Sequence, residues 1–234
     1  MKNLDSGLLT SSTCQLMQYR HIIWDWNGTI INDAHISFSI FNELANTHKL
    51  STISFDEFRA QFGFPVIDFY KRRGFDFQKL DFREIGRIFI ERYHQHLPEN
   101  PLYPDIKEII SKLKDLGLSH SVLSAHRDDM LKQSAQRYGL SEYFCVIDGL
   151  TDYYANSKTE LGRAHIKKID CPLSQIIMVG DTLHDKDTAD AMGVDCALIA
   201  CGYCSKERLL ASGAPVFDSH QDFYDFLLTQ IAKK

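Results

Sequence analysis

The sequence predicts an α/β protein with an open, Rossmann-like parallel sheet as its core and an inserted all-helical cap domain. From residue 102 onward, short apolar runs alternate with amphipathic helical segments. This pattern is typical of parallel strands covered by helices on both faces. Residues 34–101 instead show helical periodicity throughout, and no strand is predicted there. Because this helical segment follows the first predicted strand, we expect it to stand over the carboxyl edge of the sheet as a lid.

The first predicted strand is the apolar run HIIWDW, residues 21–26, which ends in turn chemistry at Asn27-Gly28. Residues 1–20 precede this strand as a polar N-terminal extension, in which we expect no more than a short helix and to which we assign no role. In the cap, apolar residues at helical spacing predict helices over residues 34–50 and 80–97.

Beyond the cap, strands and helices follow in alternation, beginning with a helix that Pro104 opens and Gly117 closes. The predicted strands are residues 118–124, 144–149, 175–181 and 196–202, and the helices between them are residues 127–139, 157–169 and 186–193. The predicted domains are therefore a core, residues 21–33 and 102–234, and a cap, residues 34–101.

Composition limits the classes of function. The formal net charge is −5 and the isoelectric point is near 6.0, which argues against a general nucleic-acid binder because such proteins carry an excess of Lys and Arg. No run approaches the roughly 18 apolar residues of a membrane span. The N-terminus does not read as a signal peptide, and the six cysteines are scattered, so we expect reduced thiols and a cytoplasmic protein. Cys201 and Cys204 form one close pair without a second pair to complete a zinc site.

Four polar residues fall at strand ends or in the loops that follow them: Asp25, Ser124, Lys158 and Asp181. The carboxyl ends of parallel strands lie at one edge of a sheet, so these side chains are expected to meet. Taken singly, Ser124 and Lys158 read as a helix cap and a solvated amine. Asp25 and Asp181 are more informative, because a carboxylate directly behind a buried strand costs desolvation energy unless it is paired or binds a metal.

These residues also resemble a known family. The stretch DWNGT, residues 25–29, resembles the first motif of the haloacid-dehalogenase superfamily of phosphohydrolases. Ser124, Lys158 and the stretch GDTLHDKDTADAMG, residues 180–193, are similar to its other three motifs and stand in the same order. The resemblance covers about residues 21–215, and its last motif is the most specific part.

The helical insert, in which Gly63-Phe64-Pro65 is similar to a cap loop, resembles that of the phosphoglycolate phosphatase branch. The resemblance implies a phosphatase that needs Mg²⁺ and acts on a small phosphorylated metabolite through an aspartyl-phosphate on Asp25. It implies Mg²⁺ ligation by Asp25, the backbone carbonyl of Asn27 and Asp181, with Asp185 as a ligand or a neighbouring acceptor. The expected catalytic residues are Asp25, Asn27, Ser124 and Lys158, and the expected substrate contacts are Thr29, Ser124, Lys158 and Arg72.

Lys158 is also expected to reduce the repulsion between Asp25 and Asp181. Arg72 belongs to the basic stretch YKRRG in the insert, which could present cations to a carboxylate or a second phosphate of the substrate. Its alternative is a solvated helix end. The sequence does not indicate an oligomeric state or a particular substrate.

Asn27 departs from the family pattern, which usually has Asp at this position as the general acid and base. An amide can neither donate the proton that a general acid supplies nor accept the proton that a general base takes up. The chain is then a phosphatase that is slow on alkyl phosphates and competent where the leaving group needs no proton, or one rescued by His35, His126 or His184. Alternatively, it is a catalytically impaired protein that binds a phospho-ligand or a partner, or a phosphotransferase. In a phosphonatase-like variant, Lys49 or Lys71 would supply a cap lysine.

Overall fold

The computed structural model describes residues 18–99, 101–150 and 158–232, and the expected helix in the N-terminal extension lies outside these ranges. A six-stranded sheet forms the core, with the strand order β3-β2-β1-β4-β5-β6 and only parallel pairs. The predicted α/β fold class is therefore confirmed. The strands are β1 (His21–Trp24), β2 (Ser119–Arg127), β3 (Val146–Leu150), β4 (Ile176–Gly180), β5 (Asp195–Ile199) and β6 (Val216–Phe217).

Both faces of the sheet are covered, because successive side chains of the mainly apolar strands β1 and β4 point to opposite faces. In β1, Ile22 and Trp24 belong to one apolar cluster and Ile23 belongs to another. The first cluster includes residues of α5, α6 and α10, and the second includes residues of α8 and α9. The bounds of the core helices are α5 (Ile106–Asp115), α6 (Asp128–Arg137), α7 (Lys158–His165), α8 (Leu183–Met192), α9 (Lys206–Leu210) and α10 (His220–Ala232).

Helix α8 begins earlier than the periodicity predicted. Its first residue is Leu183 rather than Lys186, because Thr182 and Asp185 form a capping box that starts the helix directly behind β4. The helix ends at Gly193, whose φ of 74° is the left-handed conformation that glycine adopts readily. The capping box fixes Asp185 at the carboxyl edge of the sheet.

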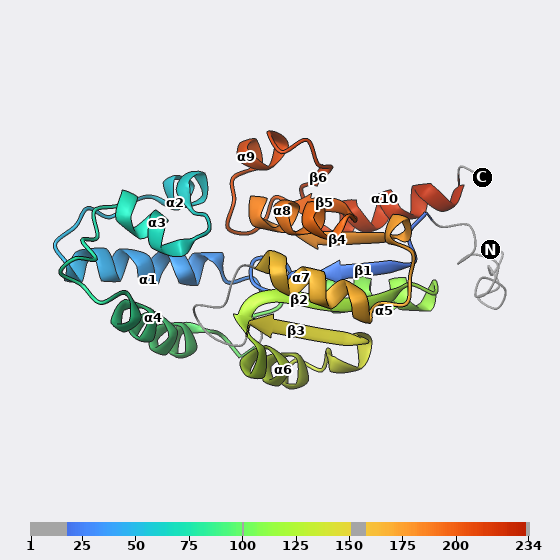
Figure 1. The fold of residues 1–234 in the computed structure, drawn as a ribbon, viewed down its shortest axis with the longest axis horizontal. Coiled ribbons are helices and arrows are strands. Elements are labelled where there is room, and N and C mark those ends of the chain that lie inside the picture. The colour runs from blue at the N-terminus through green and yellow to red at the C-terminus, as the bar shows by residue number, and fades with distance from the viewer. Residues whose placement is uncertain (1–17, 100, 151–157, 233–234) are drawn as a thin grey trace, which may run out of the picture.

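The inserted segment folds as four helices with an aromatic core of its own. Among its described residues there is no strand, and its buried rings include Phe41, Phe58, Phe69 and Phe75. The helices lie beyond the arrowheads of the strands, at the opposite end of the molecule from both termini (Figure 1). The domain boundaries at residues 33/34 and 101/102 stay predictions. The helices are α1 (Ala34–Thr47), α2 (Phe55–Gln61), α3 (Val66–Arg72) and α4 (Phe82–His96).

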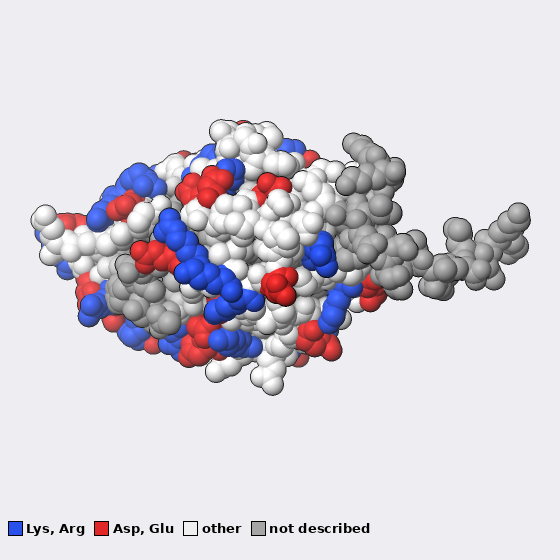
Figure 2. Space-filling model, turned by 45° about the vertical axis from the view of Figure 1, so that its right-hand side comes forward, with Lys and Arg blue, Asp and Glu red and all other residues white. Residues whose placement is uncertain are grey.

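On the face shown in Figure 2, charges of opposite sign are not separated from each other. Acidic and basic side chains lie beside one another over much of the face in Figure 2. Within the described residues, no helix combines the length and the apolar character that crossing a membrane requires.

Several buried histidines make the core sensitive to acid. His21 bridges Ser119 and Ser121 through its two ring nitrogens, at 2.7 and 2.8 Å. Burial, followed by repulsion from His165, lowers the pKa of His21 to about 4. Burial and the nearby His21 lower that of His120 to about 3. Both side chains are therefore neutral in the folded protein at neutral pH.

We expect the free energy of unfolding to fall as pH is lowered from about 6.5 toward 4. Below pH 6.5 histidines in the unfolded chain become protonated, whereas the buried histidines of the folded protein stay neutral. Each such histidine therefore lowers the free energy of unfolding by about 2 kcal/mol at pH 5. Urea unfolding at pH 7.5 and pH 5 measures this loss. In His120→Phe the pH dependence should be shallower, whereas the same change at the exposed His96 should leave it unaltered. If the free energy of unfolding depends on pH equally in both variants, His120 does not cause the loss of stability in acid.

Candidate active site

The two acids that follow neighbouring strands lie together, as the topology requires. β1 pairs with β4 in parallel, so Asp25 and Asp181 leave the sheet side by side. The backbone N–H of Asp25 continues the ladder by donating to the carbonyl of Val179 at 2.8 Å. Both side chains are buried, with 7% of Asp25 and 0% of Asp181 exposed.

Lys158 joins two carboxylates at the base of the site. It is the first described residue of α7, is 3% exposed, and donates to Oδ1 of Asp25 and, at 2.5 Å, to Oδ1 of Asp185. The other oxygen of Asp185 accepts from the backbone N–H and hydroxyl of Thr182, at 3.0 and 2.7 Å. Lys158 thus bridges Asp25 and Asp185. Its predicted effect on the repulsion between Asp25 and Asp181 stays a prediction.

Asp181 is held by two contacts from other segments. The hydroxyl of Thr29 donates to its Oδ1 at 3.0 Å, and the backbone N–H of Tyr203 donates to its Oδ2 at 2.6 Å. At Gly202, a Cβ atom would lie 2.0 Å from Oδ2 of Asp181, so only glycine allows this approach. Thr29 is fully buried and contacts Asp181, and it does not line the cavity.

The three carboxylates form a group with uncompensated negative charge. Oxygen atoms of Asp25, Asp181 and Asp185 all lie within 4.8 Å of one another. Burial raises the pKa of Asp25 to about 7 although Lys158 opposes it, and burial together with the charge of Asp25 raises that of Asp181. Burial acts in the same direction on Asp185, but Lys158 prevails and its pKa is lowered.

One lysine cannot neutralise three carboxylates, so a divalent cation fits this group. All of its donors are oxygen atoms, which are the ligands that Mg²⁺ prefers in proteins. The donor set is therefore consistent with the predicted Mg²⁺ site.

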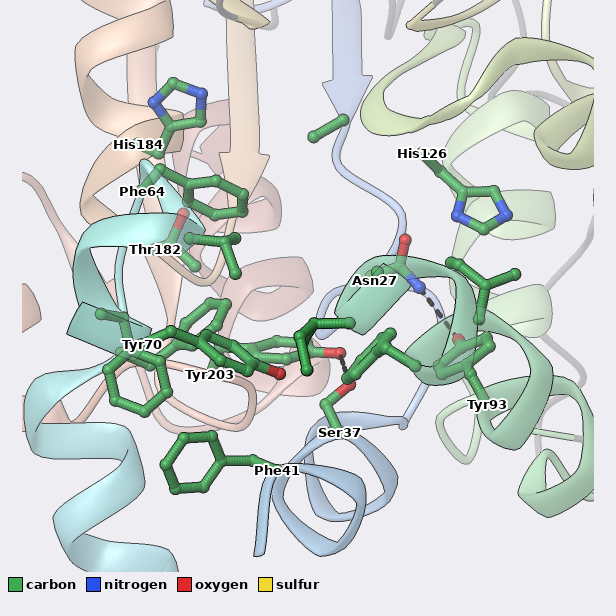
Figure 3. Close-up of a pocket in the computed structure, with 18 of the residues that line it drawn as sticks. Asn27, Ser37, Phe41, Phe64, Tyr70, Tyr93, His126, Thr182, His184 and Tyr203 are labelled. Carbon is green, nitrogen blue, oxygen red and sulfur yellow. Dashed lines mark hydrogen bonds between the residues drawn. The ribbon is translucent and has the colours of Figure 1, made fainter. Parts of the chain in front are cut away.

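Asn27 belongs to a hydrogen-bond network that the sequence did not predict. Its amide nitrogen donates to Oδ2 of Asp33 at 2.6 Å and to the hydroxyl of Tyr93 at 3.0 Å (Figure 3). The hydroxyl of Tyr93 donates to Oδ2 of Asp33 at 2.6 Å, and the N–H of Gly28 donates to Oδ1 at 2.9 Å. Asp33 is 0% exposed, and burial raises its pKa against the hydrogen bonds from Tyr93 and Asn27. An amide at position 27 is thus matched to a buried carboxyl group beside it.

Asp33 has a sequence signal, since it is an acid eight residues beyond Asp25 that follows the apolar residues Ile30 and Ile31 closely. Tyr93 has no comparable signal, because it lies on α4 at a position that helical periodicity assigns to the cap's own core. Tyr203 lies between Cys201 and Cys204, and the spacing of that pair does not indicate its contact with Asp181.

A cavity of about 540 Å³ opens between the carboxylates and the cap. Ser124, on the irregular end of β2, lines it, and its hydroxyl accepts from the N–H of His126 at 3.1 Å. His126 and His184 also line it (Figure 3), and burial lowers the pKa of both, that of His126 to about 4. The residues at its core end are Asp25, Asn27, Ser124, Ala125, His126, Lys158, Thr182, His184 and Asp185.

The structure does not bring every candidate to this cavity. Arg72 is exposed, and its guanidinium donates to the backbone carbonyl of Gln61 at 3.2 Å. His35 is exposed and stacks on Phe55, with ring centroids 3.7 Å apart. Lys49 and Lys71 are exposed as well. None of these four predicted residues is among those that line the cavity.

Comparison with known proteins agrees with this geometry. The sequence model of the haloacid dehalogenase-like hydrolase family matches residues 22–199. A putative pyrophosphatase PpaX from Caldanaerobacter subterraneus is 25% identical over 179 residues, which are 76% of this chain and 80% of that protein. A phosphoglycolate phosphatase from Chromobacterium violaceum is 25% identical over 143 residues, 60% of this chain and 64% of that protein.

A similar fold is found in a solved structure. The crystal structure of a predicted phosphatase from Clostridium acetobutylicum superposes with a TM-score of 0.72 at 22% identity, covering 90% of this chain and 99% of that one. The class defined by the fold and the site is a hydrolase with an α/β core and a helical cap. The chain belongs to the haloacid dehalogenase-like hydrolases, so the predicted resemblance is confirmed. Family membership and the relative named as a phosphoglycolate phosphatase support a phosphoric monoester hydrolase.

Proposed function

We propose that the protein is a Mg²⁺-dependent phosphatase that hydrolyses a small phosphorylated metabolite through an aspartyl-phosphate on Asp25. The observation that carries this proposal is the buried group of Asp25, Asp181, Asp185 and Lys158, of which Asp25, Asp185 and Lys158 line the floor of the cavity. Membership of a hydrolase family supports the same reaction class.

Each side chain has a separate task in this proposal. Asp25 attacks phosphorus, because it lines the cavity and its carboxylate is held by Lys158. Lys158 and the Ser124 hydroxyl hold phosphoryl oxygens and offset their negative charge. Asp25, Asp181 and the backbone carbonyl of Asn27 would hold Mg²⁺, with Asp185 beside them. When bound, the metal neutralises the phosphate dianion and orients it.

Asn27 makes the proposed enzyme selective for its leaving group. Its amide cannot protonate a departing alkoxide. His126 lines the same cavity, but its pKa of about 4 leaves it neutral at pH 7 and a poor proton donor. The expected activity is therefore low on alkyl phosphates and higher where the leaving group is stable as an anion.

Phosphate release with and without Mg²⁺ tests the proposal. We expect the natural chain to release phosphate from phenyl phosphate with Mg²⁺, and we expect chelation of the metal or the change Asp25→Asn to reduce release to background. Asp25→Asn keeps the shape of the side chain but removes the nucleophile.

Asp148→Asn is the matched control, because Asp148 is a buried acid on β3 that bonds to His165 and Lys168 away from the cavity. Its activity per folded molecule should equal that of the natural chain. Release that persists in Asp25→Asn, or an absence of Mg²⁺-dependent release from every phosphate ester tried, would refute the proposed function.

A further inference from the structure

The cavity above the carboxylates has two chemically different ends. Its core end carries the groups that would hold phosphate, whereas its cap end is apolar. Figure 3 shows the rings of Phe41, Tyr70 and Tyr203 facing the cavity from the side opposite His126. The apolar residues that line the cap end include Phe41, Phe58, Phe69, Ile85, Phe89 and Ile90.

The hydroxyls of Ser37 and Tyr203, at the cap end of the cavity, are paired with each other. They share a hydrogen bond of 2.7 Å (Figure 3). Both residues are buried, so neither hydroxyl is left to seek a polar group of the substrate. Tyr70 also lines this end and offers one phenolic hydroxyl. The substrate is therefore expected to meet most of this wall through apolar contact.

No buried cation faces this end from the described part of the chain. Three charged residues of α4 border the cavity, but Arg83, Arg87 and Glu91 are all exposed. Arg87 is paired with Glu91 and, at 2.6 Å, with Glu84. Lys158 is the buried cation in the lining, and Asp25 and Asp185 already engage it. A carboxylate or second phosphate on the substrate would therefore meet only solvent-exposed guanidinium groups at this end, and no buried cation of the described residues.

An aromatic pair closes the rim. Phe64, from the loop before α3, stacks on His184 of α8 with ring centroids 4.8 Å apart and an interplanar angle of 28°. Phe64 remains 42% exposed although it is a large apolar side chain, and both rings line the cavity (Figure 3). A ring inside the cavity would find aromatic surface at the rim as well as at the cap end.

The chemistry at the floor selects the same kind of substrate. Asn27 lines the cavity and cannot donate a proton to the leaving oxygen. A phenolic oxygen has a pKa near 10, far below that of an alkyl alcohol, so a phenolate leaves without protonation. An aryl ester therefore fits both features: its leaving group needs no proton from Asn27, and its ring fits the apolar cap end of the cavity.

We propose that the substrate is a small aryl phosphate monoester whose ring occupies the apolar end of the cavity between Asp25 and helices α1–α4. This inference rests on the proposed phosphohydrolase function and specifies its substrate class. An oxygen of Asp25 bonds to phosphorus while the bond from phosphorus to the aryl oxygen breaks, and that electron pair leaves with the phenolate. Water then attacks phosphorus, the bond to Asp25 breaks, and the proton of the water passes to solvent.

The cavity is large enough for this occupant. Its volume of about 540 Å³ lies within the range of roughly 300–1,000 Å³ typical of small-molecule sites. A phosphorylated two-carbon acid would leave much of the apolar wall uncovered.

The preference of the cap end for an aryl group can be tested with two phosphonates. This mechanism cannot hydrolyse their carbon–phosphorus bond, so binding is measured without turnover. We expect calorimetry with Mg²⁺ present to show phenylphosphonate binding at least ten times more tightly than phosphonoacetate. Equal affinities, or tighter binding of phosphonoacetate, would overturn the inference whatever the activity of the protein.

Two variants on one helix test whether the preference for phenylphosphonate arises in the cavity. Ile90 lines the cavity, whereas Ile88, two residues earlier on α4, packs on the cap's own core. Ile90→Lys should lower the affinity ratio of phenylphosphonate to phosphonoacetate by at least tenfold, because a cation then faces the substrate. Ile88→Lys should leave the ratio unchanged. A ratio that moves equally in both variants would contradict binding at this wall.

Turnover separates this inference from the proposed function. We expect phenyl phosphate to be hydrolysed at least tenfold faster, in kcat/KM, than benzyl phosphate or phosphoglycolate. Benzyl phosphate carries the ring but leaves as an alkoxide. The difference in kcat/KM between phenyl and benzyl phosphate therefore measures the effect of the leaving group at Asn27. If phosphoglycolate is hydrolysed best, the substrate class is wrong and the phosphatase stands. If no ester is hydrolysed while phenylphosphonate binds selectively, the proposed function fails and the aryl site stands.

Discussion

Exchanging the amide and the carboxyl group of Asn27 and Asp33 is expected to raise turnover of alkyl phosphates by about 10²- to 10⁴-fold. The double variant Asn27→Asp/Asp33→Asn places an acid on the cavity wall and keeps the hydrogen bonds around it. The amide of residue 33 would donate to the new carboxylate, and Tyr93, whose hydroxyl lies 3.0 Å from the replaced atom, would donate to it as well. Gly28 would keep an acceptor in the amide oxygen of residue 33.

The single change Asn27→Asp should behave differently. It would set two carboxylates against each other where the amide nitrogen now lies 2.6 Å from Oδ2 of Asp33. One of them must take up a proton or the pair must separate. We therefore expect a lower free energy of unfolding at pH 8 in the single variant and recovery of most of that loss in the double variant.

The effect of the double variant on turnover is measured as phosphate release from phosphoglycolate and from phenyl phosphate. The gain should be larger for phosphoglycolate, because its alkoxide leaving group needs the proton more. Asp33→Asn alone is the control, since it alters the network without adding an acid to the cavity wall, and it should bring no gain. A double variant that folds but is no faster than the natural chain would show that Asn27 does not limit turnover.

Replacing Lys158 by Met is expected to lower the free energy of unfolding by about 3–5 kcal/mol when no divalent cation is present. Lys158 is the cation that bonds to Asp25 and Asp185, and all three side chains are buried. Without it, the carboxylates at the floor of the cavity face one another with no counter-charge. Removing one partner of a buried ion pair leaves the other charges poorly hydrated and without a counter-charge.

Mg²⁺ should reverse much of this loss if the carboxylates bind it, because the ion then supplies the missing positive charge. Urea unfolding of Lys158→Met with EDTA and with Mg²⁺ measures both effects. Lys168→Met is the control, since Lys168 also pairs with an acid, Asp148, but is 50% exposed. Its loss should stay within about 1 kcal/mol. If Mg²⁺ fails to stabilise Lys158→Met, the carboxylate group is not a Mg²⁺ site.

The fold could be predicted because local signals agreed along the chain. The apolar strands, the helical periodicity of the insert and the order of elements after residue 102 each limited the architecture in the same way. The elements near the C-terminus were not predicted: β6 has only two residues, and no helix was predicted over α9 or α10. Helix α8 was misplaced by three residues because its start depends on the side-chain cap between Thr182 and Asp185.

The site residues at strand ends could be predicted from the topology, and Asp185 was expected from the family resemblance. Asp25 and Asp181 were expected together because neighbouring parallel strands end at one edge. The partners of Asn27 were not expected, since Tyr93 is 66 residues away and reaches it from the cap. The sequence also offered Arg72 as a specificity contact, but its helix presents it to solvent.

By itself, the sequence determined the fold class, the family and the acids at the ends of β1 and β4, because these depend on hydrophobic period, spacing and short motifs. The tertiary structure alone decided that Lys158 joins Asp25 to Asp185, that Asn27 is matched to Asp33 and Tyr93, and that the cavity is apolar at its cap end. These features depend on how distant segments pack and on which face each side chain presents. The same apolar residues that periodicity assigned to a core also form the wall of the candidate active site.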